Sequence, residues 1–242
     1  MATPTQTIRE IVEAEPSAAA VLQRFDIDLC AEAGASLQQL CADLQISLDQ
    51  VLEKLSDAEA GGRPGLLPNP ADASLSRLMQ HIVRNHHLYL RRELPPAAEM
   101  ASRVALRYGT REPAFHRLAE IVEALRIDLL AHLEREEQVI FPYIAQLDQQ
   151  AMLAYVPPQT FRTLAMPIFA MVQEHESAQR ALEEAAQLTN GFQPARHACA
   201  TQIALLGTLR GFHLDLRRHL ALEDNELFPR AMALDANLHT RN

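Results

Sequence analysis

Two stretches of this sequence decide its fold class: HLEREEQVIFP, from His132 to Pro142, and HLALEDNELFP, from His219 to Pro229. Both contain His-x-x-x-Glu, and both place Phe-Pro five and six residues after the Glu. Side chains four residues apart lie on one face of an α-helix, with Cβ atoms roughly 5–6 Å apart. Each stretch therefore predicts a helix that directs an imidazole and a carboxylate at one point.

In both stretches the His and the Glu replace apolar residues on a stripe with helical spacing. The stripe of the earlier helix is Leu118, Ile121, Leu125, Leu129, His132, Glu136 and Ile140. The stripe of the later helix is Leu205, Leu209, Phe212, Leu216, His219, Glu223 and Leu227. An ionised carboxylate on a buried face is costly unless a compensating charge lies beside it. Two such Glu residues, each with a His one turn before it, predict a pair of metal ions.

Two further helical segments present a single His to the same interior. His86 continues the spacing of Met79 and Ile82, and His175 continues that of Ile168 and Val172. Imidazole and carboxylate ligands without thiolate suit iron or manganese and are compatible with zinc. The histidines that fit the stripes less well are interpreted as non-ligands: His81, His87, His197, His213 and His239. A single His-x-x-x-Glu is usually a surface pair, but duplication on two apolar stripes argues for ligands.

The whole chain of 242 residues favours helix, because 48% of its residues are hydrophobic and only 8 are Gly. Long helical segments are expected at about 74–96, with the pattern resuming over 97–108, and at about 113–147, 160–188 and 194–233. They predict an all-α four-helix bundle over residues 74–236. Residues 59–73 are rich in Gly and Pro and are predicted to be a linker. Residues 1–58 then form a small helical domain.

Composition excludes several classes of function. The net charge of −9 provides no basic footprint for nucleic acid. No apolar run approaches the roughly 20 residues that span a bilayer, and the N-terminus does not resemble a signal peptide. A cytoplasmic protein is expected. Cys30, Cys41 and Cys199 form no Cys-x-x-Cys pair and are odd in number, so a disulfide framework is not expected.

The chain resembles the iron–sulfur cluster repair di-iron proteins, the YtfE/ScdA/NorA group, over nearly its whole length. The stretches that carry the resemblance are Arg84-Asn85-His86-His87, Glu93-Leu94-Pro95, His132 to Pro142, Glu174-His175-Glu176 and His219 to Pro229. The resemblance implies a short N-terminal domain before a hemerythrin-like bundle. It also implies a non-haem centre of two iron ions with an oxo or hydroxo bridge. By this resemblance the iron ligands are His86, His132, His175 and His219, with Glu136 and Glu223 bridging the two ions.

Two departures from the family pattern matter. Tyr108 stands where the family usually has another His ligand, and a tyrosinate can bind ferric iron, so Tyr108 joins the expected ligand set. Residues 86 and 108 would be roughly 33 Å apart on one straight helix, so the chain must break near Pro95-Pro96 or later for Tyr108 to reach the metals. His116 is an alternative ligand, and a water-filled position is another. Near Cys30 the family's second cysteine is missing, which leaves Cys30 as a reactive thiol, a ligand donor or a small loop residue.

The resemblance implies a role in nitrosative or oxidative stress, with nitric oxide or dioxygen as the small ligand and damaged iron–sulfur proteins as partners. Nitric oxide binding is favoured over cluster repair because the paired cysteines are lost. The alternative is a non-enzymatic hemerythrin-like module that stores or senses dioxygen, and a third reading is a purely structural bundle. The sequence does not decide whether the protein is an enzyme. A homodimer is compatible with it, and neither nucleic acid nor a membrane is an expected partner.

Overall fold

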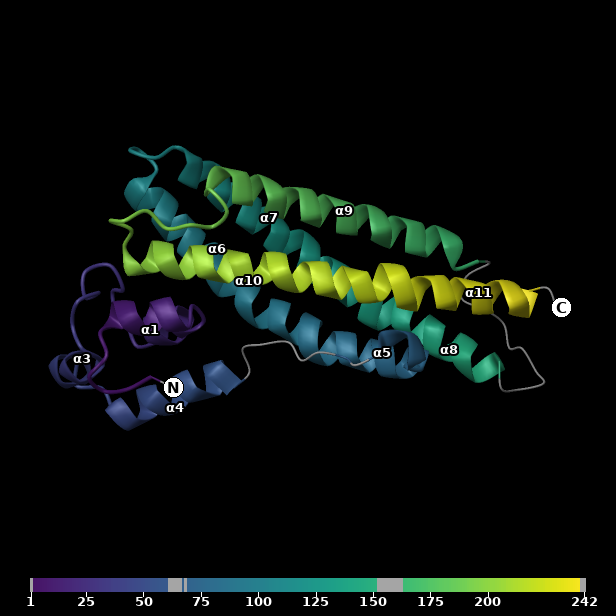
Figure 1. The fold of residues 1–242 in the computed structure, drawn as a ribbon, viewed down its shortest axis with the longest axis horizontal. Helices are drawn as coiled ribbons and strands as arrows, with labels where there is room; N and C mark the ends of the chain where they lie inside the picture. Colours follow the sequence, from purple (N-terminus) through teal and green to yellow (C-terminus); the bar gives the residue numbers. More distant parts are fainter. Residues whose placement is uncertain (1, 61–66, 68, 152–162, 240–242) are drawn as a thin grey trace. The chain divides into compact units, whose positions relative to one another are not determined.

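The computed structural model describes residues 2–60, 67, 69–151 and 163–239, and this part of the chain is built from helices (Figure 1). Beyond the helices, its only β-type pairing is an isolated bridge between Thr7 and Ser36. The predicted all-α fold class is confirmed. Most of the glycine-rich stretch in the predicted linker lies outside the described residues, as does the expected start of the third long helix at 160. Among the described helices, none has the length and apolarity needed to cross a membrane.

Four short helices open the chain. They are α1 (Ile8–Ala14), α2 (Ala18–Arg24), α3 (Leu37–Asp43) and α4 (Leu48–Ala60). A capping box begins α1, because Thr7 Oγ1 accepts from the Glu10 N–H and the Glu10 carboxylate accepts from the Thr7 N–H. Ser36 caps α3 in the same way, by accepting from the backbone of Gln39. These caps explain why such short helices begin where they do.

The rest of the described chain forms long helices. The 3₁₀ turn η1 (Pro70–Asp72) precedes α5 (Leu75–Ile82), α6 (Leu88–Tyr108), α7 (Ala114–Arg135), α8 (Phe141–Ala151), α9 (Ala165–Leu188), α10 (Ala200–Leu222) and α11 (Phe228–His239). Three π turns connect consecutive helices without a loop: η2 (Val83–His87), η3 (Glu136–Ile140) and η4 (Glu223–Leu227). The segments α5–η2–α6, α7–η3–α8, α9 and α10–η4–α11 therefore correspond to the four predicted long helices.

Each π turn contains one residue more than an α turn. The N–H of the residue after it donates five residues back, from Leu88 to Val83, from Phe141 to Glu136 and from Phe228 to Glu223. The extra residue changes which side chains face inward beyond the turn. Two of these turns are followed at once by the Phe-Pro pairs, whose proline has no N–H to donate. The duplicated Phe-Pro therefore accompanies a duplicated π turn.

Backbone contacts divide the chain into two compact units. The first unit contains Met1–Arg63, Arg91–Arg126 and Leu182–Phe212, and the second contains Pro64–Leu90, Ile127–Ala181 and His213–Asn242. These units differ in bounds from the predicted domains 1–58 and 74–236. That each of those domains folds independently stays a prediction.

The second unit has an apolar core supplied by four helical segments. In it α5 packs against α8, and α8 packs against α11 (Figure 1). Its fully buried members include Leu78 and Ile82 from α5, Ile144 and Leu147 from α8, Leu227 from η4 and Ala231 from α11, with Ile168 and Met171 added by α9. This core holds the π turns η2, η3 and η4 around a common interior.

The first unit contains a disulfide that the sequence analysis did not expect. Cys30 and Cys199 are bonded, with Cα atoms 5.1 Å apart, although 169 residues separate them in the sequence. Cys41 is a free, buried thiol. The expectation that the cysteines are unpaired is therefore wrong for Cys30 and Cys199. Local sequence patterns cannot predict a bond between residues so far apart in the chain.

Candidate metal centre

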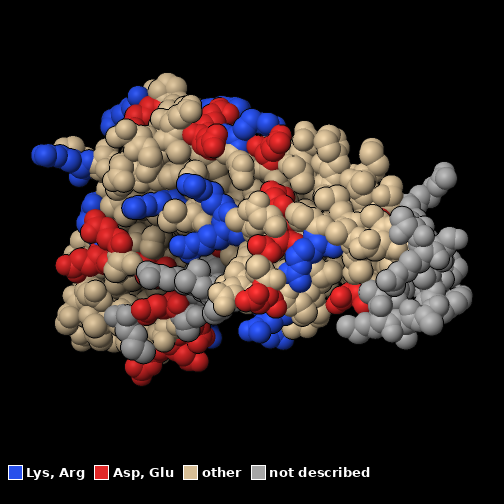
Figure 2. All heavy atoms as spheres, turned by 45° about the vertical axis from the view of Figure 1, so that its right-hand side comes forward, with Lys and Arg blue, Asp and Glu red and all other residues tan. Residues whose placement is uncertain are grey.

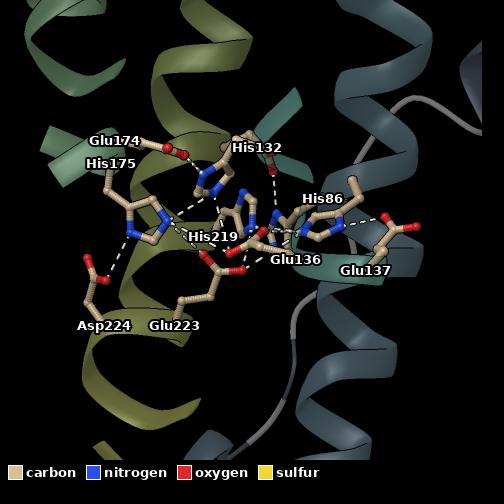
Figure 3. A network of polar contacts seen from close by, with 11 residues as sticks. His86, His132, Glu136, Glu137, Glu174, His175, His219, Glu223 and Asp224 are labelled. Carbon is tan, nitrogen blue, oxygen red and sulfur yellow. Dashed lines mark hydrogen bonds and ion pairs between the residues drawn. The ribbon is translucent and has the colours of Figure 1, made fainter. Parts of the chain in front are cut away.

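Two groups of buried side chains lie close together in the second unit (Figure 3). One group is His87, Glu136, His219 and Glu223, and the other is His132, Glu136, His175 and Glu223. Within each group one donor atom from every residue lies within 4.8 Å of the others. Glu136 and Glu223 belong to both groups, so each carboxylate can reach two positions at once.

The helices that supply these side chains explain their convergence. His132 ends a stripe on α7, and Glu136 begins the π turn η3 one turn later. The same relation holds for His219 on α10 and the first residue of η4. His175 comes from α9, and His87 is the last residue of η2. Four separate helical segments thus contribute to a single interior.

Contacts between the two carboxylates and the imidazoles are close. Nε2 of His87 lies 3.3 Å from Glu136 Oε2, and Nε2 of His132 lies 3.4 Å from Glu136 Oε1. Nε2 of His175 lies 3.3 Å from Glu223 Oε2, and Nε2 of His219 lies 2.9 Å from Glu223 Oε1. Every imidazole therefore presents Nε2 to the shared carboxylates.

Carboxylates at the rim hold three of the imidazoles in this orientation. His87 Nδ1 lies 2.7 Å from Glu137, His132 Nδ1 lies 2.7 Å from Glu174, and His175 Nδ1 lies 3.0 Å from Asp224. A carboxylate only accepts, so each Nδ1 carries the hydrogen and, in the neutral ring, Nε2 has the free lone pair. Such outer partners are typical of histidines that bind metal ions. Nδ1 of His219 has no hydrogen-bond partner among the described residues.

The interior fits a bound cation. Nε2 of His132 lies 3.1 Å from Nε2 of His175, and Nε2 of His87 lies 3.2 Å from Nε2 of His219. Two lone pairs this close repel each other unless a proton or a metal ion lies between them. Both carboxylate oxygens of Glu136 and one of Glu223 are buried without a hydrogen bond from any described residue. Buried anionic oxygens of this kind require a positive charge nearby.

The pKa values of the histidines in the two groups also reflect the negative charge of Glu136 and Glu223. Burial lowers the pKa of His87, but the facing carboxylates of Glu136 and Glu223 outweigh burial and raise it to about 10. Burial likewise opposes the effect of Glu136 on His132, whose pKa rises to about 9. For Glu223, burial raises the pKa, yet the charge and hydrogen bond of His219 bring it well below its ordinary value.

Five of the seven predicted ligands lie together, whereas His86 and Tyr108 are outside the two groups. His132, Glu136, His175, His219 and Glu223 lie in the two groups, and His87 joins them in the place expected for His86. His86 is also buried, but its Nδ1 lies 2.7 Å from Asp215 and its ring stacks on His219 at 5.3 Å. The π turn η2 explains the shift, because the inward position after Ile82 comes five residues later instead of four.

Tyr108 is not part of either group of candidate ligands. Helix α6 continues through Pro95 and Pro96 without the predicted break, and Tyr108 is its last residue. The Tyr108 hydroxyl lies 4.0 Å from Sγ of Cys30, in the first unit. The alternative ligand, His116, is outside both groups and is beside Gly109.

Charges on the surface do not change this interpretation. On the face in Figure 2, basic and acidic side chains both occur, and neither sign covers the described part of that face.

A helical bundle whose interior holds two overlapping His/Glu groups defines the hemerythrin-like class of cation-binding proteins. The chain belongs to this family, since the model of the hemerythrin HHE cation binding domain matches residues 78–231. It is 30% identical over 235 residues to the iron-sulfur cluster repair protein YtfE of Pectobacterium atrosepticum, covering 96% of this chain and 99% of that protein. The protein of the same name in Escherichia coli O1:K1 is 29% identical over 234 residues, at the same coverage.

A probable iron-sulfur cluster repair protein of Haemophilus influenzae is 27% identical over 227 residues, covering 94% of this chain and 96% of that protein. Similarity to these relatives thus extends over almost the whole chain, including the segment before the bundle. The resemblance noted from the sequence is confirmed.

Proposed function

We propose that the two overlapping groups hold two iron ions and that this centre serves the repair of iron–sulfur clusters and protection against nitric oxide. The observation that carries the proposal is the sharing of Glu136 and Glu223 between both groups. A carboxylate that reaches two positions is suited to bridging two ions, and ligands of imidazole and carboxylate suit iron. The names of the relatives support iron–sulfur proteins as the partners.

Two iron ions at this site would supply redox chemistry and a coordination position for a diatomic molecule such as nitric oxide. The surrounding residues have separate roles. His87, His132, His175 and His219 are the proposed terminal ligands, and Glu137, Glu174 and Asp224 orient the imidazoles by accepting from Nδ1.

The aromatic rings of the two Phe-Pro pairs exclude water from the interior. Phe141 stacks on His87 with ring centroids 5.7 Å apart, and Phe228 stacks on His175 at 5.9 Å. Both rings are buried. Because these two buried rings keep bulk water away from the proposed ligands, the site favours a small, weakly polar molecule.

The test is to purify the chain without oxygen, determine its iron content and add nitric oxide. Two irons per chain and a nitric oxide-dependent change in the spectrum of the reduced protein are expected. One metal per chain, or zinc alone, would contradict the di-iron centre. Rapid formation of nitrous oxide would identify an enzyme, whereas a dioxygen adduct that survives repeated cycles would favour the storage or sensing module.

A further inference from the structure

The disulfide of the first unit opens onto a cavity with a volume of about 520 Å³. Cys30 lines this cavity, so a molecule that enters it reaches the Cys30 sulfur. The same cavity is lined by Tyr108, which lies outside the His/Glu groups. The other lining residues that bear on its chemistry are Asp26, Asp28, Arg103, Arg107 and Thr201.

Hydroxyl groups surround the Cys30 sulfur. Oγ1 of Thr201 lies 3.2 Å from it, and the Tyr108 hydroxyl lies 4.0 Å from it. Both hydroxyls can donate to a thiolate formed when the disulfide opens. Asp28 accepts from the backbone N–H groups of Cys30 and Ala31, which fixes the turn that presents the sulfur. The sulfur is therefore accessible and its charged form has donors in place.

The other sulfur belongs to Cys199, the residue directly before α10. The Cys199 carbonyl accepts from the Ile203 N–H, and its own N–H donates to the Gln202 side chain, so Cys199 is the capping residue of this 23-residue helix. A thiolate at a helix N-terminus is stabilised by the helix dipole and is a good leaving group. The two sulfurs thus differ, with Cys30 open to attack and Cys199 suited to depart.

The cavity also carries charges of both signs. Arg103 and Arg107 are one turn apart on α6, and Asp26 and Asp28 come from the segment that contains Cys30. Hydrogen bonds from Ala31 and Cys30, together with the positive charge of the two arginines, hold the pKa of Asp28 below its ordinary value. Both backbone N–H groups donate to Oδ1 of Asp28. Arg103 and Arg107 are the cationic side chains among the lining residues, so they can meet an incoming carboxylate.

We propose that Cys30 and Cys199 form a thiol–disulfide exchange site whose substrate is a small thiol bearing carboxylate and ammonium groups. The substrate thiolate attacks Sγ of Cys30, the bond between the two protein sulfurs breaks, and Cys199 leaves as a thiolate. A second substrate thiolate attacks the substrate sulfur of the mixed disulfide and releases Cys30. In total the protein disulfide gains two electrons and two substrate thiols become one substrate disulfide. Arg103 and Arg107 bind the substrate carboxylates in both steps.

Glutathione is the probe, and 2-mercaptoethanol is the matched thiol without charged groups. Full-length protein is treated with each, quenched by alkylation and analysed by mass spectrometry of non-reduced peptides. Opening of the Cys30–Cys199 link, with Cys41 unmodified, is expected with both. Cys199→Ser is instead treated with oxidised glutathione: the Cys30 thiolate attacks its disulfide, one glutathione leaves as the thiolate, and a stable glutathione adduct should stay on Cys30 because the resolving sulfur is gone. Absence of that adduct in folded Cys199→Ser protein would overturn the proposal, as would equal modification of Cys41.

Recognition by the cavity is tested separately. Replacement of both arginines, by Arg103→Gln and Arg107→Gln, should slow the reaction with glutathione by about tenfold and leave the reaction with 2-mercaptoethanol unchanged. Arg111→Gln is the control, since this exposed arginine is close in sequence but does not line the cavity. If the double variant reacts with glutathione at the unaltered rate, the substrate class is wrong. If it loses reactivity towards both thiols equally, charge recognition is overturned.

Discussion

Glu136 and Glu223 are buried acidic residues whose charge must be balanced by their neighbours. Both are fully buried, both face imidazoles on two sides, and three of their four carboxylate oxygens have no hydrogen bond from a described residue. Each belongs to both candidate groups. Their role should therefore differ in kind from that of other acidic residues on the same helices.

Glu136→Gln and Glu223→Gln should each reduce the iron content of the purified chain strongly, because an amide cannot supply the bridging charge. Glu134→Gln is the matched control, since Glu134 is on the same helix but is exposed. Glu137 is no neutral control, because it holds His87. Its change to Ala should weaken metal affinity by about 10–100-fold. Iron analysis after expression in iron-replete medium is the measurement, and equal iron loss in the Glu134 variant would show that the assignment of faces is wrong.

His86 and His87 allow a second test at the residue scale. His87→Ala removes an Nε2 that faces Glu136, and it should lower iron content to near one ion per chain. His86→Ala removes a ring that stacks on His219 and contacts Asp215, so iron content should stay near that of the unaltered protein. Spectra of the two variants, recorded beside iron analysis, provide the comparison. The reverse order of effects would restore His86 as the ligand.

His86 and His87 also show which parts of the site could be predicted from the sequence. The spacing of His132, Glu136, His219 and Glu223 predicted their convergence correctly, because each pair lies within one α-helical turn. His86 was chosen over His87 because a π turn between them and Ile82 has no signature in spacing alone. Tyr108 was assigned by analogy, but the helix that carries it does not break at Pro95 and Pro96.

At the scale of helices, the close approach of α10 to the N-terminal segment is sensitive to a single Cβ atom. Within the first unit, a Cβ added at Gly207 would lie 2.4 Å from Cγ of Pro16. Glycine is unfavourable inside a helix by about 1 kcal/mol relative to alanine. The close approach of Pro16 therefore explains why a glycine stands at position 207, although glycine disfavours a helix.

Gly207→Ala should destabilise the protein by roughly 1–3 kcal/mol, because Pro16 or the helix must move despite the gain in propensity. Gly34→Ala is the control, because nothing lies within 4 Å of a Cβ at that position. Thermal unfolding followed by circular dichroism measures the difference. Iron content should be the same in both variants, since all the proposed ligands belong to the second unit. A Gly207 variant that melts at the unaltered temperature would show that the contact yields without cost.

At the scale of the whole molecule, the sequence predicted the helices well and the long-range pairing poorly. Apolar stripes and caps are local signals, so the four long segments could be located from them. The bond between Cys30 and Cys199 joins residues 169 positions apart, and no local pattern specifies it. The cavity beside that bond depends on three separated segments and could not be anticipated for the same reason.

Stability of the whole molecule should depend on pH in a way that reveals what balances the buried carboxylates. In the metal-free chain, protons on His87 and His132 balance Glu136 and Glu223, which raises the two pKa values to about 10 and about 9. A folded-state pKa above the unfolded value of about 6.5 stabilises the fold fully below pH 6.5. That contribution is lost as pH rises through the folded-state pKa. Metal-free protein should therefore melt at progressively lower temperature between about pH 7 and pH 10.

Iron-loaded protein should behave differently, because the metal ions replace those protons and bind the neutral imidazoles. Its melting temperature should change little over the same range, so the difference between loaded and chelated protein should widen with pH. Calorimetry at several pH values, under anaerobic conditions for the loaded form, gives both curves. Glu136→Gln removes one of the charges that raise both pKa values, and its metal-free form should show a shallower decline. Parallel curves for loaded and chelated wild-type protein would mean that protons and metal ions do not compete for the same imidazoles.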